Sequence, residues 1–227
     1  GRRACQDRFG PRDGPGPALK DVLFDHGRAA RIGLPEAVFC EGKPAETVRA
    51  MIASFMGGEA AAPVLFTRLA ADVVAALPAP ERAGLDYDAL SRTAFTGTLP
   101  QHARGSVALV SAGTADGAVA AEAARTLTYL GIAHATYADC GVAGLWRLVD
   151  RLEAINAHDV VIVVAGLDAA LASVLGALTP RPVLAVPTSV GYGAADGGRT
   201  ALGAMLVSCA PGVSGMNIDN GYGAATA

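Results

Sequence analysis

The stretch that decides the fold is SVALVSAGTADGAVAAEAARTLTYLG, residues 106–131. It begins with a short run of β-branched and aliphatic residues, which is typical of a strand covered on both faces in a parallel sheet. Residues 114–117 then lead into an alanine-rich segment that ends at Gly131, a residue suited to closing a helix. The stretch therefore predicts one strand–turn–helix unit.

The same alternation continues along the chain to Pro187. Strand-like segments lie at residues 132–140, 159–166 and 183–187, and helix-like segments lie between them at residues 142–155 and 167–178. Strands and helices that alternate with short turns are typical of a doubly wound parallel sheet with right-handed crossovers. We therefore predict an α/β domain over residues 104–227, with helices on both faces of the sheet.

The chain before residue 104 has a different pattern. Residues 1–17 are rich in Arg, Asp, Gly and Pro, which predicts a flexible arm because so few apolar side chains can be buried. Residues 18–103 predict a small α+β unit. We expect strands at 37–40 and 63–69, helices at 44–56 and 71–84, and a linking segment or edge strand at 87–98.

Composition narrows the class of protein. Hydrophobic residues make up 52% of the 227 residues but aromatic residues only 5%, so the core must be built from Ala, Val and Leu. The net charge is −3 and the only run of basic residues is Arg2-Arg3, so nothing indicates a nucleic-acid partner. Without a long apolar run or a recognisable signal peptide, we expect a cytoplasmic protein with no membrane partner.

The cysteines and histidines are dispersed along the chain. The four cysteines lie at residues 5, 40, 140 and 209, with no C-x-x-C pair, and the four histidines lie at 26, 102, 134 and 158. This spacing supports neither a zinc site nor a disulfide framework, so we interpret the cysteines as free thiols.

Candidate ligand-binding residues follow the predicted strands, because ligands of doubly wound sheets gather at the carboxyl ends of the strands. Ser111, Thr114 and Asp116 stand between a strand and a helix N-terminus, which suits a phosphate or carboxylate. Thr114 or Asp116 could equally cap that helix, and no G-x-G-x-x-G spacing is present. Asp168 follows the apolar strand predicted at residues 159–166, where it would orient a substrate, activate a water molecule or cap a helix.

The C-terminal stretch is rich in glycine. Ser189 to Gly198 offers many backbone N–H groups, which is typical either of a phosphate-binding loop or of an ordinary flexible loop. Cys209 precedes an Ala-Pro-Gly turn. It is either inert packing or a nucleophile whose pKa a positive neighbour would have to lower, and Arg199 is the only nearby cation in sequence. Residues 217–220 form either a turn or part of a pocket.

Five segments of the chain closely resemble the LarB family, which carries out a carboxylase and hydrolase step in the biosynthesis of the nickel-pincer nucleotide cofactor. They are DHGRAARIGLPEAVFCEGK at 25–43, SAGTADGAVAAEAA at 111–124, VVAGLDAALASVLGAL at 163–178, AVPTSVGYGA at 185–194 and SCAPGVSGMNIDNGYGA at 208–224. The C-terminal half of this family is related to aminoimidazole ribonucleotide carboxylase, PurE, so the resemblance implies a PurE-like three-layer domain.

The resemblance also implies a reaction. The family carboxylates the pyridinium ring of nicotinic acid adenine dinucleotide with CO₂ and cleaves the phosphoanhydride, giving pyridinium-3,5-biscarboxylic acid mononucleotide and AMP. Cys209 matches the family cysteine that adds to the ring, and such an addition would make the ring able to attack CO₂. Asp168 aligns with an acid that is usually glutamate and would abstract a proton or activate water.

Further roles follow from the same resemblance. No tightly bound cofactor is implied, Mg²⁺ is a candidate ion for the hydrolysis, and the relatives assemble as homo-octamers. Trp146 would stack on a ring or pack in a helix core. The residues expected to bind substrate are Ser111, Gly113, Thr114, Asp116, Trp146, Ser189, Gly191, Tyr192, Gly193, Asn217, Asp219 and Asn220.

Two alternatives remain at this point. One is a purine enzyme of the aminoimidazole ribonucleotide carboxylase or mutase type. Those relatives use the histidine of a Ser-Ala-His-Arg segment after the second strand, where this chain has DCGVAGLWR at 139–147, without a histidine. The other alternative is a non-catalytic nucleotide-binding protein with the same fold.

Overall fold

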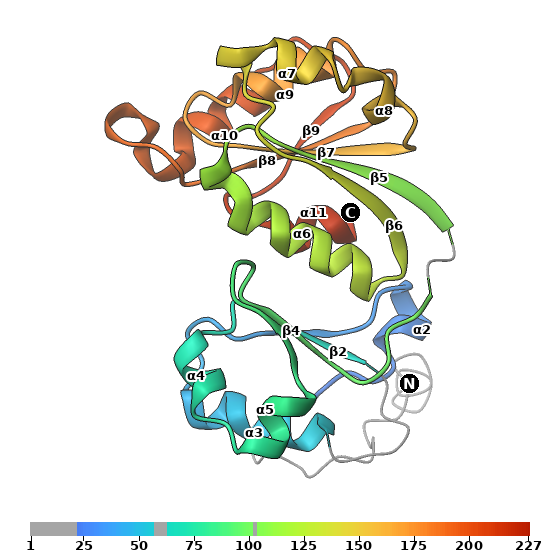
Figure 1. Ribbon diagram of the computed structural model, residues 1–227, viewed down its shortest axis with the longest axis vertical. Coiled ribbons are helices and arrows are strands. Elements are labelled where there is room, and N and C mark those ends of the chain that lie inside the picture. The colour runs from blue at the N-terminus through green and yellow to red at the C-terminus, as the bar shows by residue number, and fades with distance from the viewer. Residues whose placement is uncertain (1–21, 57–62, 102–103) are drawn as a thin grey trace, which may run out of the picture. The chain divides into compact units, whose positions relative to one another are not determined.

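A computed structural model describes residues 22–56, 63–101 and 104–227 of the chain (Figure 1). The polypeptide divides after Leu99 into two units, which are considered separately below. The flexible arm predicted at residues 1–17 lies outside the described residues. No helix in the described ranges is long and apolar enough to cross a membrane.

The larger unit is built on a sheet of five parallel strands. They are β5 (Arg104–Ser111), β6 (Ile132–Tyr137), β7 (Val160–Ala165), β8 (Val183–Pro187) and β9 (Val213–Gly215), in the order β6-β5-β7-β8-β9. The predicted α/β fold with a doubly wound parallel sheet is confirmed. The strand order reverses between β5 and β7, and ligands of such sheets bind at this switch point, outside the carboxyl ends of the strands.

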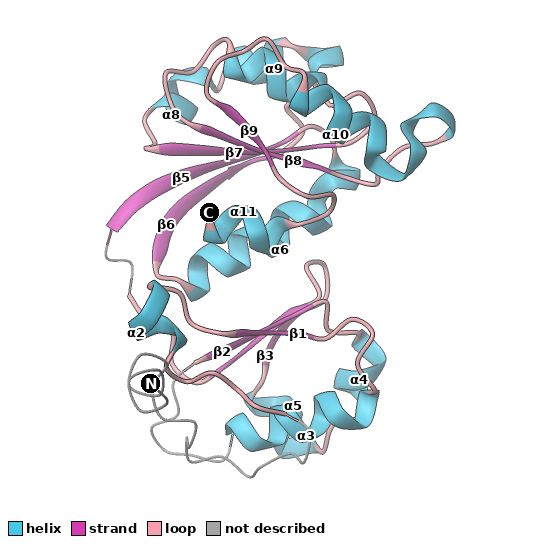
Figure 2. Ribbon diagram, turned by 180° about the vertical axis from the view of Figure 1, so that it is seen from behind, coloured by secondary structure: helices cyan, strands magenta, loops and turns pink. Residues whose placement is uncertain are grey.

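Helices cover both faces of this sheet (Figures 1 and 2). One face carries α6 (Gly117–Tyr129) and α11 (Gly221–Thr226), and the other carries α7 (Trp146–Val149), α8 (Leu152–Asn156), α9 (Ala170–Gly176) and α10 (Arg199–Leu206). Three 3₁₀ turns lie in the connections: η1 (Thr114–Asp116), η2 (Val142–Gly144) and η3 (Gly193–Gly198). The helix predicted at 142–155 is thus divided into η2, α7 and α8.

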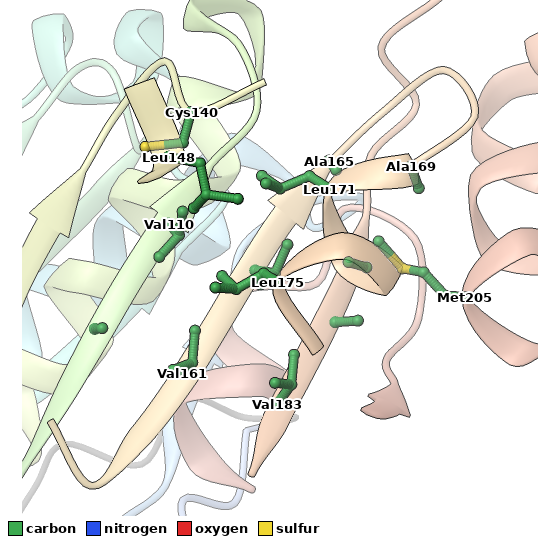
Figure 3. Packing of buried hydrophobic residues seen from close by; sticks show 14 of the residues in the cluster. Val110, Cys140, Leu148, Val161, Ala165, Ala169, Leu171, Leu175, Val183 and Met205 are labelled. Carbon is green, nitrogen blue, oxygen red and sulfur yellow. The ribbon is translucent and has the colours of Figure 1, made fainter. Parts of the chain in front are cut away.

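Small aliphatic side chains fill the core, as the composition requires. Figure 3 shows Val110, Val161 and Val183 from three neighbouring strands packed against Leu171 and Leu175 of α9. All five side chains are at most 1% exposed. Burying each of them contributes on the order of 1.5–3 kcal/mol, which fixes the strand ends that carry the loops.

The smaller unit contains a mixed four-stranded sheet. Its strands are β1 (Ala37–Phe39), β2 (Val64–Thr67), β3 (Asp86–Asp88) and β4 (Thr93–Thr96), in the order β1-β2-β4-β3. Only β1 and β2 are parallel. The helices are α2 (Arg28–Ile32), α3 (Ala45–Met56), α4 (Ala71–Ala75) and α5 (Ala79–Gly84). This arrangement confirms the expected small α+β unit.

Details of the smaller unit differ from the prediction. Residues 87–98 were expected to be a linking segment or edge strand, but β4 lies between β2 and β3 and all four of its residues are buried. The single helix expected at 71–84 is divided into α4 and α5 at Pro78. A proline inside a helix lacks the required N–H group and clashes with the preceding turn, so the division follows from the residue itself.

Candidate functional site

The loops that follow the five parallel strands meet at one edge of the larger unit. The N–H group of Cys140 donates to the carbonyl of Ser111, that of Leu167 to Val190 and that of Asp219 to Pro187, each at 2.9 Å. These bonds join the loop after β5 to the loop after β6, and the loop after β8 to those after β7 and β9. The structure therefore brings together the strand-end segments in which substrate binding was predicted.

Asp116 holds two of these loops in place. One oxygen of its carboxylate accepts a hydrogen bond from the Thr188 hydroxyl at 2.7 Å, and the other accepts from the Gly113 N–H group at 2.8 Å. The side chain is only 3% exposed and precedes α6, whose positive N-terminal end favours a negative charge. Asp116 thus positions the loop after β5 against the loop after β8. Direct contact with a substrate stays a prediction.

Thr188 is enclosed by two glycines. A Cβ atom on Gly166 would lie 2.6 Å from the Thr188 hydroxyl oxygen and 2.5 Å from the carbonyl oxygen of Val190. Gly198 has a φ of +92°, and its Cβ would lie 2.7 Å from the Thr188 carbonyl oxygen. Both positions require glycine. Gly166 lies where the loops after β7 and β8 approach each other at backbone distance, and Gly198 lies where the connection after β8 folds back onto its own start. The sequence-based reasoning assigned no role to Thr188, although a hydroxyl directly after a buried strand could have indicated one.

Strained backbone gathers at the same edge. Among the described residues of the larger unit, every non-glycine residue with a positive φ lies in a loop that follows a strand. They are Asp139, Leu167, Ala169, Asp196 and Asp219, with φ between 46° and 58°. Each costs about 1–3 kcal/mol, and such strain is typical of ligand-binding sites whose loops are held by surrounding contacts.

Asp168 lies between two of these strained residues, Leu167 and Ala169. Its side chain is exposed, and one carboxylate oxygen accepts from the Ala170 N–H group at 3.4 Å, which is long for a helix cap. The structure therefore gives the capping interpretation little support. The carboxylate lies at the rim of the strand ends, where it can take part in proton transfer.

Cys209 lies at the other edge of the sheet. It belongs to the connection between α10 and β9, and the carbonyl of Gly212 in this connection accepts from the N–H group of Val183, the first residue of β8. Asp168 instead follows the last residue of β7. Ser208, the residue before Cys209, shares a 2.8 Å hydrogen bond with Ser173 inside α9, whereas Asp168 lies before the start of that helix.

Arg199 is also remote from Cys209. It opens α10 and lies 3.9 Å from the carboxylate of Asp196, whereas Cys209 follows the far end of the helix. An eight-residue helix is about 12 Å long. The cation that is nearest to the thiol in sequence therefore does not lie beside it in this chain.

The exposure of the cysteines distinguishes Cys209. Within the described residues the free thiols are Cys40 and Cys140, both buried, and Cys209, which is exposed. Cys5 lies outside the described residues. Cys209 is therefore the only described thiol that an external ring could reach.

The remaining predicted residues occupy three settings. Ser111 is buried at the end of β5. In the last loop, Asp219 accepts from the Ser189 N–H group at 2.8 Å and Asn220 accepts from the Gly223 N–H group at 2.7 Å. The Asn220 bond caps the N-terminus of α11, and the Asp219 bond joins the loop after β9 to the loop after β8. The turn interpretation is matched at Asn217, whose side chain accepts from the N–H group of Ile218 and whose carbonyl accepts from the N–H group of Asn220 at 3.3 Å. Around the loop after β8, Gly191 and Gly193 have φ of 139° and 55°, and Tyr192 is 87% exposed.

Trp146 lies on the surface. Its side chain is 68% exposed at the start of α7, so the interpretation that it packs in a helix core is wrong. The proposed stacking on a ring stays a prediction. Among the described residues, no group of three or more His, Cys, Asp or Glu side chains is placed to hold a metal ion.

Comparisons with known proteins agree with this architecture. The smaller unit matches the model of the LarB/PurE-like N-terminal domain over residues 18–98, and the larger unit matches that of AIR carboxylase over residues 106–227. An uncharacterized protein of Methanocaldococcus jannaschii is 45% identical over 122 residues, which are 53% of this chain and 46% of the relative. The matched segment thus spans about half of that protein. Since the two family models together match most of the sequence, the chain belongs to the LarB family, with a PurE-like C-terminal domain.

Proposed function

We propose that this protein carboxylates the pyridinium ring of nicotinic acid adenine dinucleotide and cleaves its phosphoanhydride to release AMP. The observation that carries the proposal is the exposed thiol of Cys209 in a domain of the carboxylase family. The segment after β6 lacks the histidine of the purine enzymes, which disfavours a purine substrate. The matching N-terminal domain supports the LarB reaction over the purine reaction.

The role of the thiol follows from the chemistry of the ring. A pyridinium is an electrophile and a poor carbon nucleophile. When the Cys209 thiolate forms a bond to a ring carbon, the displaced electron pair moves to the ring nitrogen and the ring becomes enamine-like. A ring carbon then forms a bond to CO₂, and the electron pair of the enamine is consumed.

The remaining steps restore the aromatic ring. Asp168 takes the proton from the newly carboxylated carbon, and the C–H electron pair returns to the ring. Expulsion of the Cys209 thiolate breaks the C–S bond and regenerates the pyridinium. Overall, a ring C–H group and CO₂ become a ring carboxylate and a proton, so no oxidant or reductant is required. Water then attacks the phosphoanhydride and AMP leaves.

Cys209 lies in the connection that leads into β9, whereas Asp168 follows the end of β7, so a second chain would be one way to bring a thiol and this carboxylate to the same ring. We infer that the site forms between copies in a homo-oligomer, in which one copy supplies the thiol and another the carboxylate. Exposed apolar side chains support such contacts. Trp146, Leu206 and Val207 are 66–81% exposed, all on or beside the helices of the α7–α10 face. Surfaces of this kind are typical of protein interfaces.

We place the substrate's phosphates at the switch point of the sheet, where ligands of such sheets bind. Ser111, Gly113 and Thr114 after β5 and the backbone of residues 189–193 after β8 surround this position. Asp116 and Thr188 hold the two loops against each other. A binding surface made mainly of backbone N–H groups would suit a diphosphate.

Product analysis tests the proposal. The purified protein is incubated with ¹³C-bicarbonate and either nicotinic acid adenine dinucleotide or aminoimidazole ribonucleotide, with and without Mg²⁺, and the products are identified by mass spectrometry. We expect AMP and a labelled biscarboxylated mononucleotide from the dinucleotide only. Carboxylation of the purine precursor would favour the purine enzyme. Binding of the dinucleotide without turnover would favour a non-catalytic protein.

A further inference from the structure

A separate cavity lies in the smaller unit. It has a volume of about 170 Å³ and is found where the parallel strands β1 and β2 end. Its lining includes Cys40, Glu41 and Lys43 from the turn after β1, Arg68 after β2, and Arg92 from the turn before β4. The mechanism proposed above uses none of these residues.

Positive charge dominates this cavity. Lys43, Arg68 and Arg92 contribute three cations, whereas Glu41 is the single acidic residue of the lining. The Arg68 guanidinium lies 3.6 Å from the Glu41 carboxylate. This excess of cations is notable in a chain whose net charge is −3. Such a lining attracts a small anion.

Two of the cations, Lys43 and Arg92, carry N–H donors that bond to no described residue. The ammonium group of Lys43 makes no ion pair or hydrogen bond with any described residue. The Arg92 guanidinium donates to the carbonyl of Arg68 at 3.3 Å, its one side-chain hydrogen bond within the described residues. A guanidinium carries five N–H donors, so most of those on Arg92 remain for a ligand.

The backbone is held in a defined conformation at two of these three residues. Arg68 and Arg92 have φ of 54° and 55°, in the left-handed region that long side chains rarely adopt. The N–H group of Leu69 donates to the Arg92 carbonyl at 2.7 Å, which links the two turns. Strain that the surrounding bonds maintain is typical of a preorganised binding site.

The cysteine in the cavity lining carries no negative charge that would repel an anion. Cys40 is only 6% exposed, and this burial raises the pKa of its thiol to about 12, although Lys43 and Arg92 act to lower it. The thiol is therefore neutral at physiological pH. Val48 and Val73 add apolar side chains to the lining. The N-terminus of the twelve-residue helix α3 begins at Ala45, next to the Lys43 turn.

We propose that this cavity binds a small oxyanion of the phosphate class through Lys43, Arg68 and Arg92. The cavity holds roughly five to six times the 30 Å³ that a water molecule occupies in the liquid. Pockets for whole drug-sized ligands measure roughly 300–1,000 Å³. The site therefore suits free phosphate or the terminal phosphate of a small molecule. This inference is independent of the proposed carboxylation.

Titration of the full chain with inorganic phosphate and with AMP tests the inference. Calorimetry gives the affinity, and hydrogen–deuterium exchange shows where the ligand protects the backbone. We expect protection of residues 40–43 and 68–70. Lys43→Gln and Arg92→Gln should each weaken binding at this site about tenfold or more, as expected for the loss of a charge-assisted bond. Arg82→Gln removes an exposed cation of the same unit, outside the cavity lining, and should bind like wild type.

Each outcome of this experiment is decisive. If both inorganic phosphate and AMP protect residues 40–43 and 68–70, free phosphate is enough to occupy the site. If only AMP protects them, the site binds a phosphate ester. Protection confined to the larger unit, wild-type affinity in both cavity variants, or no binding of either ligand would overturn the inference. If Arg92→Gln fails to fold, Lys43→Gln carries the test, because the Lys43 side chain makes no hydrogen bond or ion pair with a described residue. Its charge-preserving control is Lys43→Arg.

Discussion

Asp168 is held by its neighbours in a way that suits a catalytic role. The strained residues Leu167 and Ala169 turn the chain on either side of it, and the 3.4 Å contact to Ala170 leaves its carboxylate largely available. A side chain whose only role was to cap α9 would be expected to make a shorter bond. The geometry therefore leaves the carboxylate available for the proposed proton transfer, which mutation can test.

Asp168→Asn should slow carboxylation by roughly 10²–10⁴-fold, because an amide cannot accept the ring proton. Asp168→Glu should retain activity, since glutamate is the usual residue of the family at this position. Asp150→Asn serves as a control, because it removes an exposed carboxylate at the end of α7. Turnover of the dinucleotide measures all three. An unchanged rate in Asp168→Asn would remove this residue from the site.

At the scale of elements, the loops at the strand ends depend on close backbone contact. Gly166 lets the loop after β7 approach the loop after β8 at Thr188, and Gly198 lets the connection after β8 fold back onto Thr188. The bond between Asp116 and Thr188 then fixes the loop after β5. The arrangement positions the predicted nucleotide-binding loops before any ligand is bound.

Gly166→Ala should destabilise the protein by about 1–3 kcal/mol and weaken nucleotide binding, because its Cβ would lie 2.5 Å from the Val190 carbonyl oxygen. Gly203→Ala is the matched control. Gly203 lies in α10 with no atom within 4 Å of its Cβ position, so alanine there should stabilise by about 0.5–1 kcal/mol. Urea denaturation measures both. Equal stabilities would contradict the proposed close approach.

The sequence predicted the central elements because they are long and apolar. The strands β5, β7 and β8 each contain an aliphatic run of at least four residues, and such runs are buried where a parallel sheet forms. The strand β9 was not predicted, and the hairpin of β3 and β4 was predicted only as one linking segment or edge strand at 87–98. The Val-Ser-Gly strand β9 is too short to show a periodicity, and β4 reads Thr-Ala-Phe-Thr, whose burial depends on its neighbours in the sheet.

The candidate site was predicted less completely. The order of the strands along the chain was enough to predict which segments lie at the carboxyl ends of the strands. The bond between Asp116 and Thr188, however, joins residues 72 positions apart, and no local pattern indicates it. The separation of Cys209 from Asp168 could have been predicted if β9 had been recognised. A residue between a helix and the next parallel strand lies at the amino edge of the sheet. The exposure of Trp146 depends on packing that sequence does not show.

At the scale of the whole molecule, the positions of Cys209 and Asp168 predict complementation between inactive variants. Co-expressed Cys209→Ala and Asp168→Asn chains should form mixed oligomers in which about a quarter of the shared sites combine an intact thiol with an intact carboxylate. We expect about that fraction of wild-type activity in mixed oligomers isolated through two different affinity tags. Either variant alone should be inactive. No recovery in the mixture would contradict a shared site.

The central claim is that the thiol of Cys209 attacks the pyridinium ring. The most direct measurement is incorporation of ¹³C-bicarbonate into the mononucleotide by wild type, Cys209→Ser and Cys209→Ala. Since Cys209 is exposed, both variants should fold and bind the dinucleotide like wild type. We predict that neither variant incorporates label above background. Incorporation at the wild-type rate by either variant would contradict the covalent mechanism.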